Sequence, residues 1–286
     1  MSTLTPTVLT IAGSDSGGGA GIQADLKAFA RCGVHGTSAI TAITAQNTVG
    51  VTAIHPIPPE IVLAQVRAVL SDIGVDAVKV GMLGTAEVAL AVAAALDELP
   101  TGTPVVVDPV MVAESGAPLL AADAQRALID EILPRASVLT PNLSEARALA
   151  GREPEPEPEA ADGEEAVADE DAEAEALARA VLALGPRIVV LTGGHRARAV
   201  DLFLDSAGEG SAVEIEGVRH PDGAGHGSGC THSSVLAAQL ALGHTPLEAA
   251  RAAHRLAAAA VANGLRDLGQ GAGPVDVLGL ERMRSY

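Results

Sequence analysis

Aromatic residues are almost absent from the sequence: there is no Trp, and only Phe29, Phe203 and Tyr286 carry aromatic rings. A chain of 286 residues must therefore build its core from Ala, Val, Leu and Ile, and a ring-shaped ligand finds few aromatic platforms for stacking. Basic residues are also scarce, since 18 Lys and Arg stand against 36 Asp and Glu, and only Lys27 and Lys79 are lysines. The net charge of −18 argues against nucleic acid and anionic membranes as partners.

Cysteine is scarce as well. Cys32 and Cys230 cannot build a disulfide framework, which is typical of a reducing compartment. The start of the chain shows neither the basic nor the apolar stretch of a signal peptide. The Ala-rich stretch Arg251–Asn263 is interrupted by His254 and Arg255 and is too short to cross a bilayer. We therefore expect a cytoplasmic protein.

The excess of acid is concentrated in one segment. Residues 152–175 hold 12 of the 36 acidic residues, and Glu153–Glu159 alternates Glu with Pro. Such a segment repels itself and stays extended. We predict a single domain over 1–286 with an acidic, solvated surface insertion at about 152–173; a docking or regulatory tail is the alternative.

Short apolar runs alternate with longer helical patterns, as in βα units around a parallel sheet. We predict strands at Val8–Ala12, Thr37–Ile43, Ala77–Val80, Val105–Asp108, Ser137–Leu139, Ile188–Thr192, Ala199–Leu204 and Ala212–Glu216. We predict helices at Gly21–Arg31, Pro59–Ile73, Thr85–Leu99, Ala121–Ile132, Ala174–Leu184, Thr231–Leu242 and Pro246–Asn263, with another beginning in Pro141–Leu149. The pattern favours an α/β fold whose ligands bind at the carboxyl ends of the strands.

A glycine-rich loop, Gly13–Gly21, joins the first predicted strand to the first predicted helix. Its five glycines in nine residues allow close backbone approach, and its amides can point at a ligand. It fits neither the Walker A pattern nor G-x-G-x-x-G. We predict ligand contact of unspecified type, with a tight turn as the alternative.

Further polar side chains follow other strands. Gln46 offers a donor and an acceptor that suit the edge of an aminopyrimidine, or it caps a turn, and Met82 is either an apolar wall or core. Asp108 is expected at the strand-end crevice. Asn142 and Glu145 share a face at a helix start, where they are oxygen ligands for Mg²⁺ or the cap and first turn of the helix.

The segment His226–Thr231 runs from glycines into an Ala-rich helix. Such a helix N-terminus is an anion hole that can stabilise a transferred phosphoryl group. At this terminus we predict a lowered pKa for the Cys230 thiol, which makes it a base or nucleophile; a buried structural Cys is the alternative. His220 and His232 are predicted at the surface, because no metal-ligand spacing connects them.

These segments also resemble a known family. The resemblance is carried by Ala12–Asp15, Gly18–Asp25, Thr44–Thr48, Gly81–Leu83, Asp108–Met111, Thr140–Glu145, Gly193–His195 and His226–Thr231. In this order they resemble the hydroxymethylpyrimidine/phosphomethylpyrimidine kinases of thiamine biosynthesis, over Thr10–Pro274 apart from the acidic insertion. This family belongs to the ribokinase-like superfamily, which implies a three-layer fold with a mostly parallel central sheet and helices on both faces. Cys230 stands where the related sugar kinases carry Asp.

The resemblance implies two successive phosphoryl transfers from ATP with Mg²⁺, first to 4-amino-5-hydroxymethyl-2-methylpyrimidine and then to its monophosphate, by a homodimer. It implies substrate contacts at Gly13, Asp25, Thr44, Gln46 and Met82. It implies ATP contacts at Asn142, Thr192, Gly194, His226 and Ser228, and Mg²⁺ contacts at Asn142 and Glu145. Catalysis would involve Asp108, Gly227, Gly229 and Cys230, the last assisting deprotonation of the attacking hydroxyl.

The chain departs from the family pattern where Thr192 and His254 replace the usual lysines, so Arg196 or Arg198 is considered as a substitute cation. Three other hypotheses stay open. The first is a pyridoxal or pyridoxine kinase on the same scaffold. The second is a thiol enzyme with Cys230 as nucleophile and His226 as base. The third is a catalytically silent binding or regulatory domain.

Overall fold

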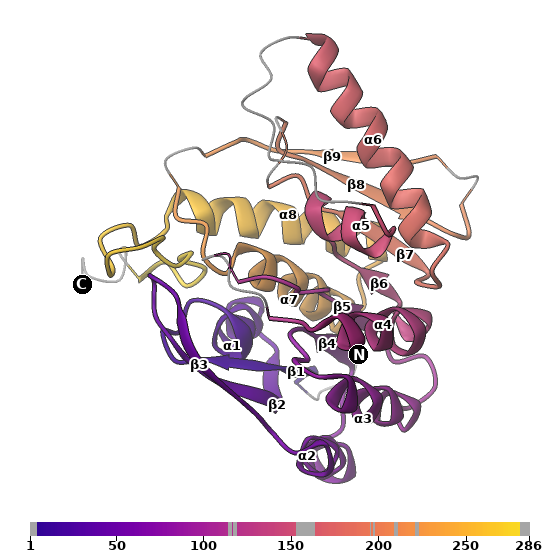
Figure 1. Cartoon of the computed structure of the whole chain (residues 1–286), viewed down its shortest axis with the longest axis vertical. Helices are drawn as coiled ribbons and strands as arrows, with labels where there is room; N and C mark the ends of the chain where they lie inside the picture. The colour runs from indigo at the N-terminus through magenta and orange to yellow at the C-terminus, as the bar shows by residue number, and fades with distance from the viewer. Residues whose placement is uncertain are drawn as a thin grey trace.

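The computed structural model describes residues 5–113, 116, 119–152, 164–194, 196, 198–208, 211–220 and 223–280 (Figure 1). Its strands are β1 (Thr7–Asp15), β2 (His35–Gln46), β3 (Val51–Pro56), β4 (Ala77–Val80), β5 (Val105–Val107), β6 (Val138–Leu139), β7 (Ile188–Leu191), β8 (Val200–Asp205) and β9 (Val213–Glu216). Its α-helices are α1 (Gly21–Cys32), α2 (Pro59–Asp72), α3 (Ala86–Asp97), α4 (Ala122–Ala127), α5 (Leu143–Leu149), α6 (Glu164–Leu182), α7 (Ser228–Ala241) and α8 (Pro246–Ala262). A π-turn (Leu128–Ile132) and a 3-10 turn (Leu133–Arg135) continue α4.

In the described part of the chain, nine strands form one sheet in the order β3-β2-β1-β4-β5-β6-β7-β8-β9. The six strands from β2 to β7 in this order are parallel. Antiparallel strands complete both edges, β3 on one side and β8 with β9 on the other. The carboxyl ends of the parallel strands therefore meet at one edge, and the predicted ligand-binding loops follow these ends.

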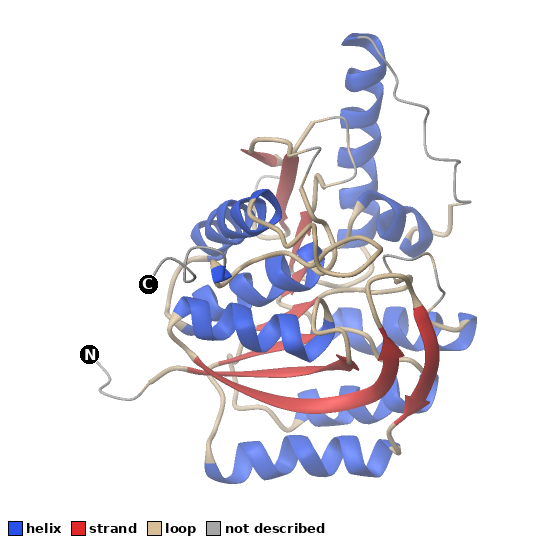
Figure 2. Cartoon of the chain, turned by 90° about the vertical axis from the view of Figure 1, so that its left-hand side faces the viewer, coloured by secondary structure: helices blue, strands red, loops and turns tan. Residues whose placement is uncertain are grey.

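Two separate cores lie on the two faces of the sheet, because successive side chains of a strand point to opposite faces. In β1, Val8 packs in the core that includes α1, α7 and α8, whereas Leu9 packs in the core that includes α2, α3 and α6. Figure 2 shows the sheet between these two helical layers. The predicted three-layer α/β fold with a mostly parallel sheet is confirmed.

Strand β3 was not predicted from the sequence. Five of its six residues are exposed, so its side chains show no alternation between buried and exposed faces. Antiparallel pairing with β2 holds the strand in place, with Thr44 opposite Ile54. Only this tertiary pairing makes the segment a strand.

Helix α6 begins at Glu164 instead of the predicted Ala174. The alternating Glu and Pro residues of 153–159 lie outside the described residues. The acidic residues of α6 are anchored, since Asp171 pairs with Arg196 and with Arg198 Nη1 at 2.7 Å. Glu173 accepts a hydrogen bond from Arg147 Nη2 at 2.6 Å. Two acidic side chains of this segment, those of Asp171 and Glu173, are therefore paired with arginines, and the acidic insertion at about 152–173 stays a prediction.

None of the helices in the described ranges combines the length and apolar composition that a bilayer crossing requires.

Candidate active site

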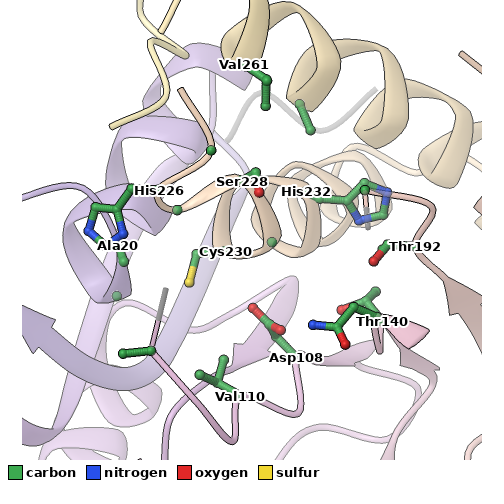
Figure 3. A pocket seen from close by; sticks show the side chains of 18 of the residues that line it. Ala20, Asp108, Val110, Thr140, Thr192, His226, Ser228, Cys230, His232 and Val261 are labelled. Carbon is green, nitrogen blue, oxygen red and sulfur yellow. The ribbon is translucent and has the colours of Figure 1, made fainter. Parts of the chain in front are cut away.

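A cavity of about 410 Å³ lies at the carboxyl-terminal edge of the sheet. Its lining includes residues at or just beyond the ends of β1, β4, β5, β6 and β7, together with the start of α7 and part of α8. The sheet order gives the cavity two halves, one beside β1 and β2 and the other beside β6, β7 and β8. Figure 3 shows the start of α7 between them, with Cys230 and Asp108 facing each other across the cavity. Every predicted site residue except Asp25 lines this cavity.

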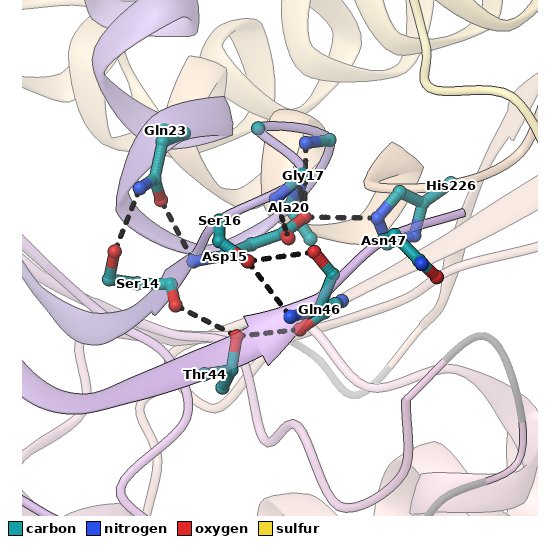
Figure 4. A network of polar contacts seen from close by, with 12 residues as sticks. Ser14, Asp15, Ser16, Gly17, Ala20, Gln23, Thr44, Gln46, Asn47 and His226 are labelled. Atoms are coloured by element: carbon teal, nitrogen blue, oxygen red, sulfur yellow. Dashed lines mark hydrogen bonds and ion pairs between the residues drawn. The ribbon is translucent and has the colours of Figure 1, made fainter. Parts of the chain in front are cut away.

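Asp15 organises the glycine-rich loop from within (Figure 4). Its carboxylate accepts hydrogen bonds from the backbone N–H groups of Gly17 (2.7 Å), Gly19 (3.0 Å) and Ala20 (2.9 Å). The same carboxylate lies 3.1 Å from Nε2 of His226. Burial opposes the charge, but these contacts outweigh it, so the pKa of Asp15 is lowered. Asp15 therefore joins the glycine-rich loop to the anion-binding loop that precedes α7.

Gly227 allows these two loops to touch. It is the N-cap of α7 and has a φ of +82°, in the left-handed region that favours glycine. A Cβ at this position would lie 1.8 Å from the backbone oxygen of Gly19. The closeness of the two backbones thus requires the absence of a side chain.

Gly227→Ala is therefore expected to lower the free energy of unfolding by about 2–4 kcal/mol, because left-handed strain adds to a backbone collision. Gly229→Ala is the matched control, since a Cβ there meets nothing within 4 Å and the residue lies inside α7. The control should change the unfolding free energy by less than about 1 kcal/mol. Denaturant unfolding of both variants measures this, and equal losses would contradict the argument.

The half of the cavity beside β1 combines an amide with an apolar wall. The Thr44 hydroxyl lies 3.0 Å from Oε1 of Gln46 and 2.9 Å from the backbone oxygen of Ser14. Met82 packs on Gly13, where a Cβ would come within 2.5 Å of Met82 Cε. The predicted residues Gly13, Thr44, Gln46 and Met82 are therefore brought together at this end.

Asp25, in contrast, does not line the cavity. It is fully buried and accepts hydrogen bonds from Thr10 (2.6 Å), Ser234 (2.7 Å) and Lys79 (3.0 Å). All its neighbours are protein groups, so the predicted direct contact with substrate is wrong. Asp25 acts on the cavity from behind its lining, through its ion pair with Lys79, which does line it, and through its charge.

Lys79 is the functional residue that the sequence analysis missed. It is fully buried in β4, and its Nζ lies 3.0 Å from Asp25 and 3.7 Å from Asp108. Burial disfavours the ammonium charge, but the surrounding groups, with Asp25 the largest contributor, outweigh this effect, and the pKa of Lys79 is raised. The available signal was a lysine inside the apolar run Ala77–Val80 of a chain with two lysines.

The prediction of an acidic Cys230 thiol is wrong. Burial raises the pKa of Cys230 to about 12; Lys79 lowers it, whereas Asp108 and Asp25 add to the rise. Burial also raises the pKa of Asp108, whose carboxylate accepts a hydrogen bond from Ser233 at 3.1 Å. Desolvation and neighbouring carboxylates thus outweigh the helix N-terminus on which the prediction rested.

Asn142 and Glu145 form the capping box of α5. Asn142 Oδ1 accepts from the backbone N–H of Glu145 at 2.8 Å, and Glu145 Oε2 accepts from the backbone N–H of Asn142 at 2.9 Å. Both residues also line the cavity, so they cap the helix and face the cavity at the same time. Burial, reinforced by the charge of Asp108, raises the pKa of Glu145 to about 8.

The half of the cavity beside β7 and β8 contains a group centred on Asp201. Its Oδ2 lies 3.0 Å from His232 Nε2 and 2.9 Å from His254 Nδ1, and its Oδ1 accepts from the Gly193 backbone N–H at 2.8 Å. The predicted surface position of His232 is therefore wrong, since its side chain is only 6% exposed. Thr192 also lines this half (Figure 3).

Neither Arg196 nor Arg198 substitutes for the missing lysines. Arg196 is buried against Asp171 and donates to the backbone oxygen of Val200 at 2.9 Å, and neither arginine lines the cavity. Among the described lining residues, the Lys and Arg side chains are Lys79 and Arg219.

Comparison with known proteins places this chain among kinases. The profile of the phosphomethylpyrimidine kinase family matches residues 15–276. A hydroxymethylpyrimidine/phosphomethylpyrimidine kinase of Rhizobium meliloti is 47% identical over 95% of this chain and 97% of its own length. The corresponding protein of Haemophilus influenzae is 43% identical over 94% of this chain and 95% of its own.

Solved structures agree on the fold. A phosphomethylpyrimidine kinase from Clostridium difficile has a TM-score of 0.72 at 36% identity, covering 88% of this chain and 97% of its own. A pyridoxal kinase from Staphylococcus aureus in complex with AMP-PCP has a TM-score of 0.81 at 31% identity, covering 98% and 96%.

A strand-end cavity with a glycine-rich helix N-terminus at its centre, on this ribokinase-like fold, defines a phosphotransferase that acts on small molecules. The family match and the relatives narrow this class of phosphotransferases to one family. The chain belongs to the phosphomethylpyrimidine kinase family.

Proposed function

We propose that this protein transfers a phosphoryl group from ATP to the hydroxymethyl group of 4-amino-5-hydroxymethyl-2-methylpyrimidine, and then a second one to the resulting monophosphate. The observation that carries the proposal is that Gln46 and Met82 line the same cavity as the loop of Gly227–Cys230. The high identity to relatives that bear this name supports the choice of substrate.

The proposed division of the cavity follows from its chemistry. The pyrimidine would lie beside β1, where the amide of Gln46 offers a donor and an acceptor to a heteroaromatic edge and Met82 offers an apolar wall. The nucleotide would lie beside β7 and β8, near Thr192 and Gly194. The amides at the start of α7 would then hold the transferring phosphoryl group between them.

The donor set beside Asp108 fits Mg²⁺. Burial raises the pKa of both Asp108 and Glu145, and the charge of Asp108 adds to the rise at Glu145; a bound divalent cation would favour the ionised form of both groups. In the part of the chain that the structure describes, no group of three or more His, Cys, Asp or Glu side chains is arranged to hold a metal. A magnesium ion held by few protein oxygens and by phosphates matches this, with Asn142 and Glu145 as its contacts. When bound, it would neutralise charge on the transferring phosphoryl group.

In the proposed mechanism, the side chains and amides of the cavity mainly position the reacting groups and neutralise their charge. The Gly227–Cys230 loop orients the phosphoryl group, and Lys79 stabilises the carboxylate of Asp108 beside it. Cys230 holds the attacking hydroxyl and accepts its proton through the thiolate fraction, which increases with pH. The thiol-enzyme hypothesis requires His226 to act as the base for Cys230. In the structure, the polar partner of the His226 ring is Asp15.

The experiment that tests this function is ADP release from MgATP with three separate acceptors: the hydroxymethylpyrimidine, its monophosphate and pyridoxal. Turnover on both pyrimidines with little on pyridoxal is the expected result. Turnover on pyridoxal alone would move the assignment to a pyridoxal kinase, which the similarity to the Staphylococcus aureus structures makes the second candidate. Silence on all three would favour a binding domain.

Gln46→Ala is expected to raise the KM for the pyrimidine by about five- to tenfold with little change in kcat, because one hydrogen bond to a bound ring is lost. Steady-state kinetics at saturating ATP measures this. Gln270→Ala is the matched control, since Gln270 is exposed and lies outside the cavity lining. An unchanged KM would remove Gln46 from the substrate site.

We further propose that the protein is a homodimer. Strand β3 is an edge strand whose Ile54 is 41% exposed, and Ile43 of β2 and Val49 before β3 are 50% and 61% exposed. An exposed apolar edge of this kind is a surface that a second copy can cover. Sedimentation of the full chain should give twice the monomer mass of 28.6 kDa.

A further inference from the structure

The cluster of Asp201, His232 and His254 carries a single carboxylate between two imidazoles. The two rings lie 3.0 Å and 2.9 Å from the same oxygen, Asp201 Oδ2. Since an ionised carboxylate only accepts hydrogen bonds, His232 Nε2 and His254 Nδ1 must both carry hydrogen. The remaining nitrogens, His232 Nδ1 and His254 Nε2, are buried without a hydrogen-bond partner in the described structure.

His254 Nε2 is the atom at which the cluster gains or loses a proton. With this nitrogen protonated, the cluster is neutral; without this proton, it has the full negative charge of Asp201. The contact with Asp201 raises the pKa of His254 despite its burial, and the pKa of Asp201 is lowered because the two imidazoles outweigh its own burial. The charge of the cluster therefore changes at a pH above the ordinary pKa of histidine.

The cluster lies in the half of the cavity assigned to the nucleotide. Asp201, His232 and His254 all line it, and Asp201 also fixes the turn after β7 through the Gly193 backbone N–H. His254 Nε2 faces Gly217, where a Cβ would come within 1.9 Å of it. Gly217 begins the segment that contributes Val218, Arg219 and His220 to the same half.

Because the cavity lining is acidic, the proton on this cluster affects the binding of a polyphosphate. The described lining contains the carboxylates of Asp15, Asp108, Glu145 and Asp201, against the cations Lys79 and Arg219. Lys79 is already shared between Asp25 and Asp108. A polyphosphate entering the half beside β8 is therefore exposed to any uncompensated charge on Asp201.

We propose that the Asp201–His232–His254 cluster is a titratable positioning group for the nucleotide, whose proton sets the affinity of this kinase for adenine nucleotides. The protonated cluster is neutral and admits the polyphosphate; the deprotonated cluster repels it. This inference rests on the proposed placement of the nucleotide. The charged groups that act on His254 are Asp201 on β8 and Arg255 on its own helix. His232 on α7 acts on Asp201 and on Asp108.

The test uses binding of ADP with Mg²⁺, measured by titration calorimetry from about pH 7 to about pH 9 in wild type and in His254→Lys, whose cation does not titrate in this range. The Kd of wild type divided by that of His254→Lys should rise roughly tenfold across the range. At the alkaline end, wild-type binding should also take up more protons than binding by His254→Lys. Glu145 titrates in this range too, but it is present in both proteins and cancels in the ratio.

Other outcomes separate the two claims. A ratio that stays constant with pH, while both proteins bind ADP, would overturn the role of the cluster and leave the kinase function standing. No ADP binding by wild type at any pH would overturn the nucleotide site itself. If His254→Lys does not fold, His254→Gln takes its place: it has no titrating proton, so the ratio of the wild-type Kd to its Kd should again rise with pH. His244→Gln is the control, since its histidine is exposed and outside the cavity lining. In kinetics, the KM for ATP should rise with pH more in wild type and His244→Gln than in His254→Lys.

Discussion

Lys79→Met is expected to lower the free energy of unfolding by about 3–5 kcal/mol, because it leaves buried carboxylates without their counter-charge. Lys79 Nζ is fully buried between Asp25 at 3.0 Å and Asp108 at 3.7 Å. Met preserves most of the side-chain volume, so the loss reports charge more than packing. Kinase turnover should fall with stability, since Asp108 faces the cavity from the same network.

Denaturant unfolding against Lys27→Met tests this expectation. Lys27 is the other lysine of the chain, and it donates one hydrogen bond to the backbone oxygen of Gly18 at 2.6 Å. Its replacement should cost about 1 kcal/mol. Adding Asp25→Asn to Lys79→Met should restore part of the lost stability, because one unpaired charge disappears. Similar losses for the two lysine variants would show that the buried pair does not stabilise the fold.

Cys230→Ala is expected to reduce kcat by about 10²–10⁴-fold while the Kd for the pyrimidine stays within about twofold. The thiol lies at the start of α7, in the centre of the cavity, whereas the residues proposed for the pyrimidine lie at one end. The measurement combines steady-state turnover with direct binding of the hydroxymethylpyrimidine. Cys32→Ala is the matched control, since Cys32 ends α1 outside the cavity lining.

The pKa of Cys230 also predicts the direction in which kcat changes with pH. Because the pKa of Cys230 is raised to about 12, the thiol is protonated at neutral pH and its thiolate fraction grows with pH. Wild-type kcat should therefore rise between about pH 7 and about pH 9, and the rise should disappear in Cys230→Ala. Unaltered turnover in the variant would end the proposed role of this cysteine.

The parallel core of the fold could be predicted from sequence because its strands and helices carry their own patterns. The buried run Val105–Val107 is apolar throughout, and Thr85 caps α3 by accepting from the Val88 N–H at 3.3 Å. Strand β3 has no such pattern, since it is exposed and depends on β2. The early start of α6 depends on partners that follow it in sequence, such as Arg198.

The candidate site could be predicted where glycine-rich segments and the order of the motifs indicate it. It could not be predicted where a residue's role depends on its burial and on partners distant in the sequence. Nothing near His232 in the sequence indicates Asp201, which lies 31 residues earlier. Asp25 belongs to a specific motif, yet its role follows from Lys79, 54 residues away. The pKa of Cys230 depends on the neighbouring carboxylates of Asp108 and Asp25, which its sequence neighbours do not indicate.

The contact between Asp15 and His226 has a consequence for synthesis of the chain, because it joins residues 211 positions apart. Strand β1 comes first in the sequence but lies inside the sheet, and α7 packs back against α1 and β1. A nascent chain that already contains the glycine-rich loop and Gln46 therefore lacks the opposite wall of the cavity until Gly227–Cys230 has been made. Ligand-binding capacity arises only after Gly227–Cys230 has been made, so neither substrate can assist the earlier folding of β1 and β2.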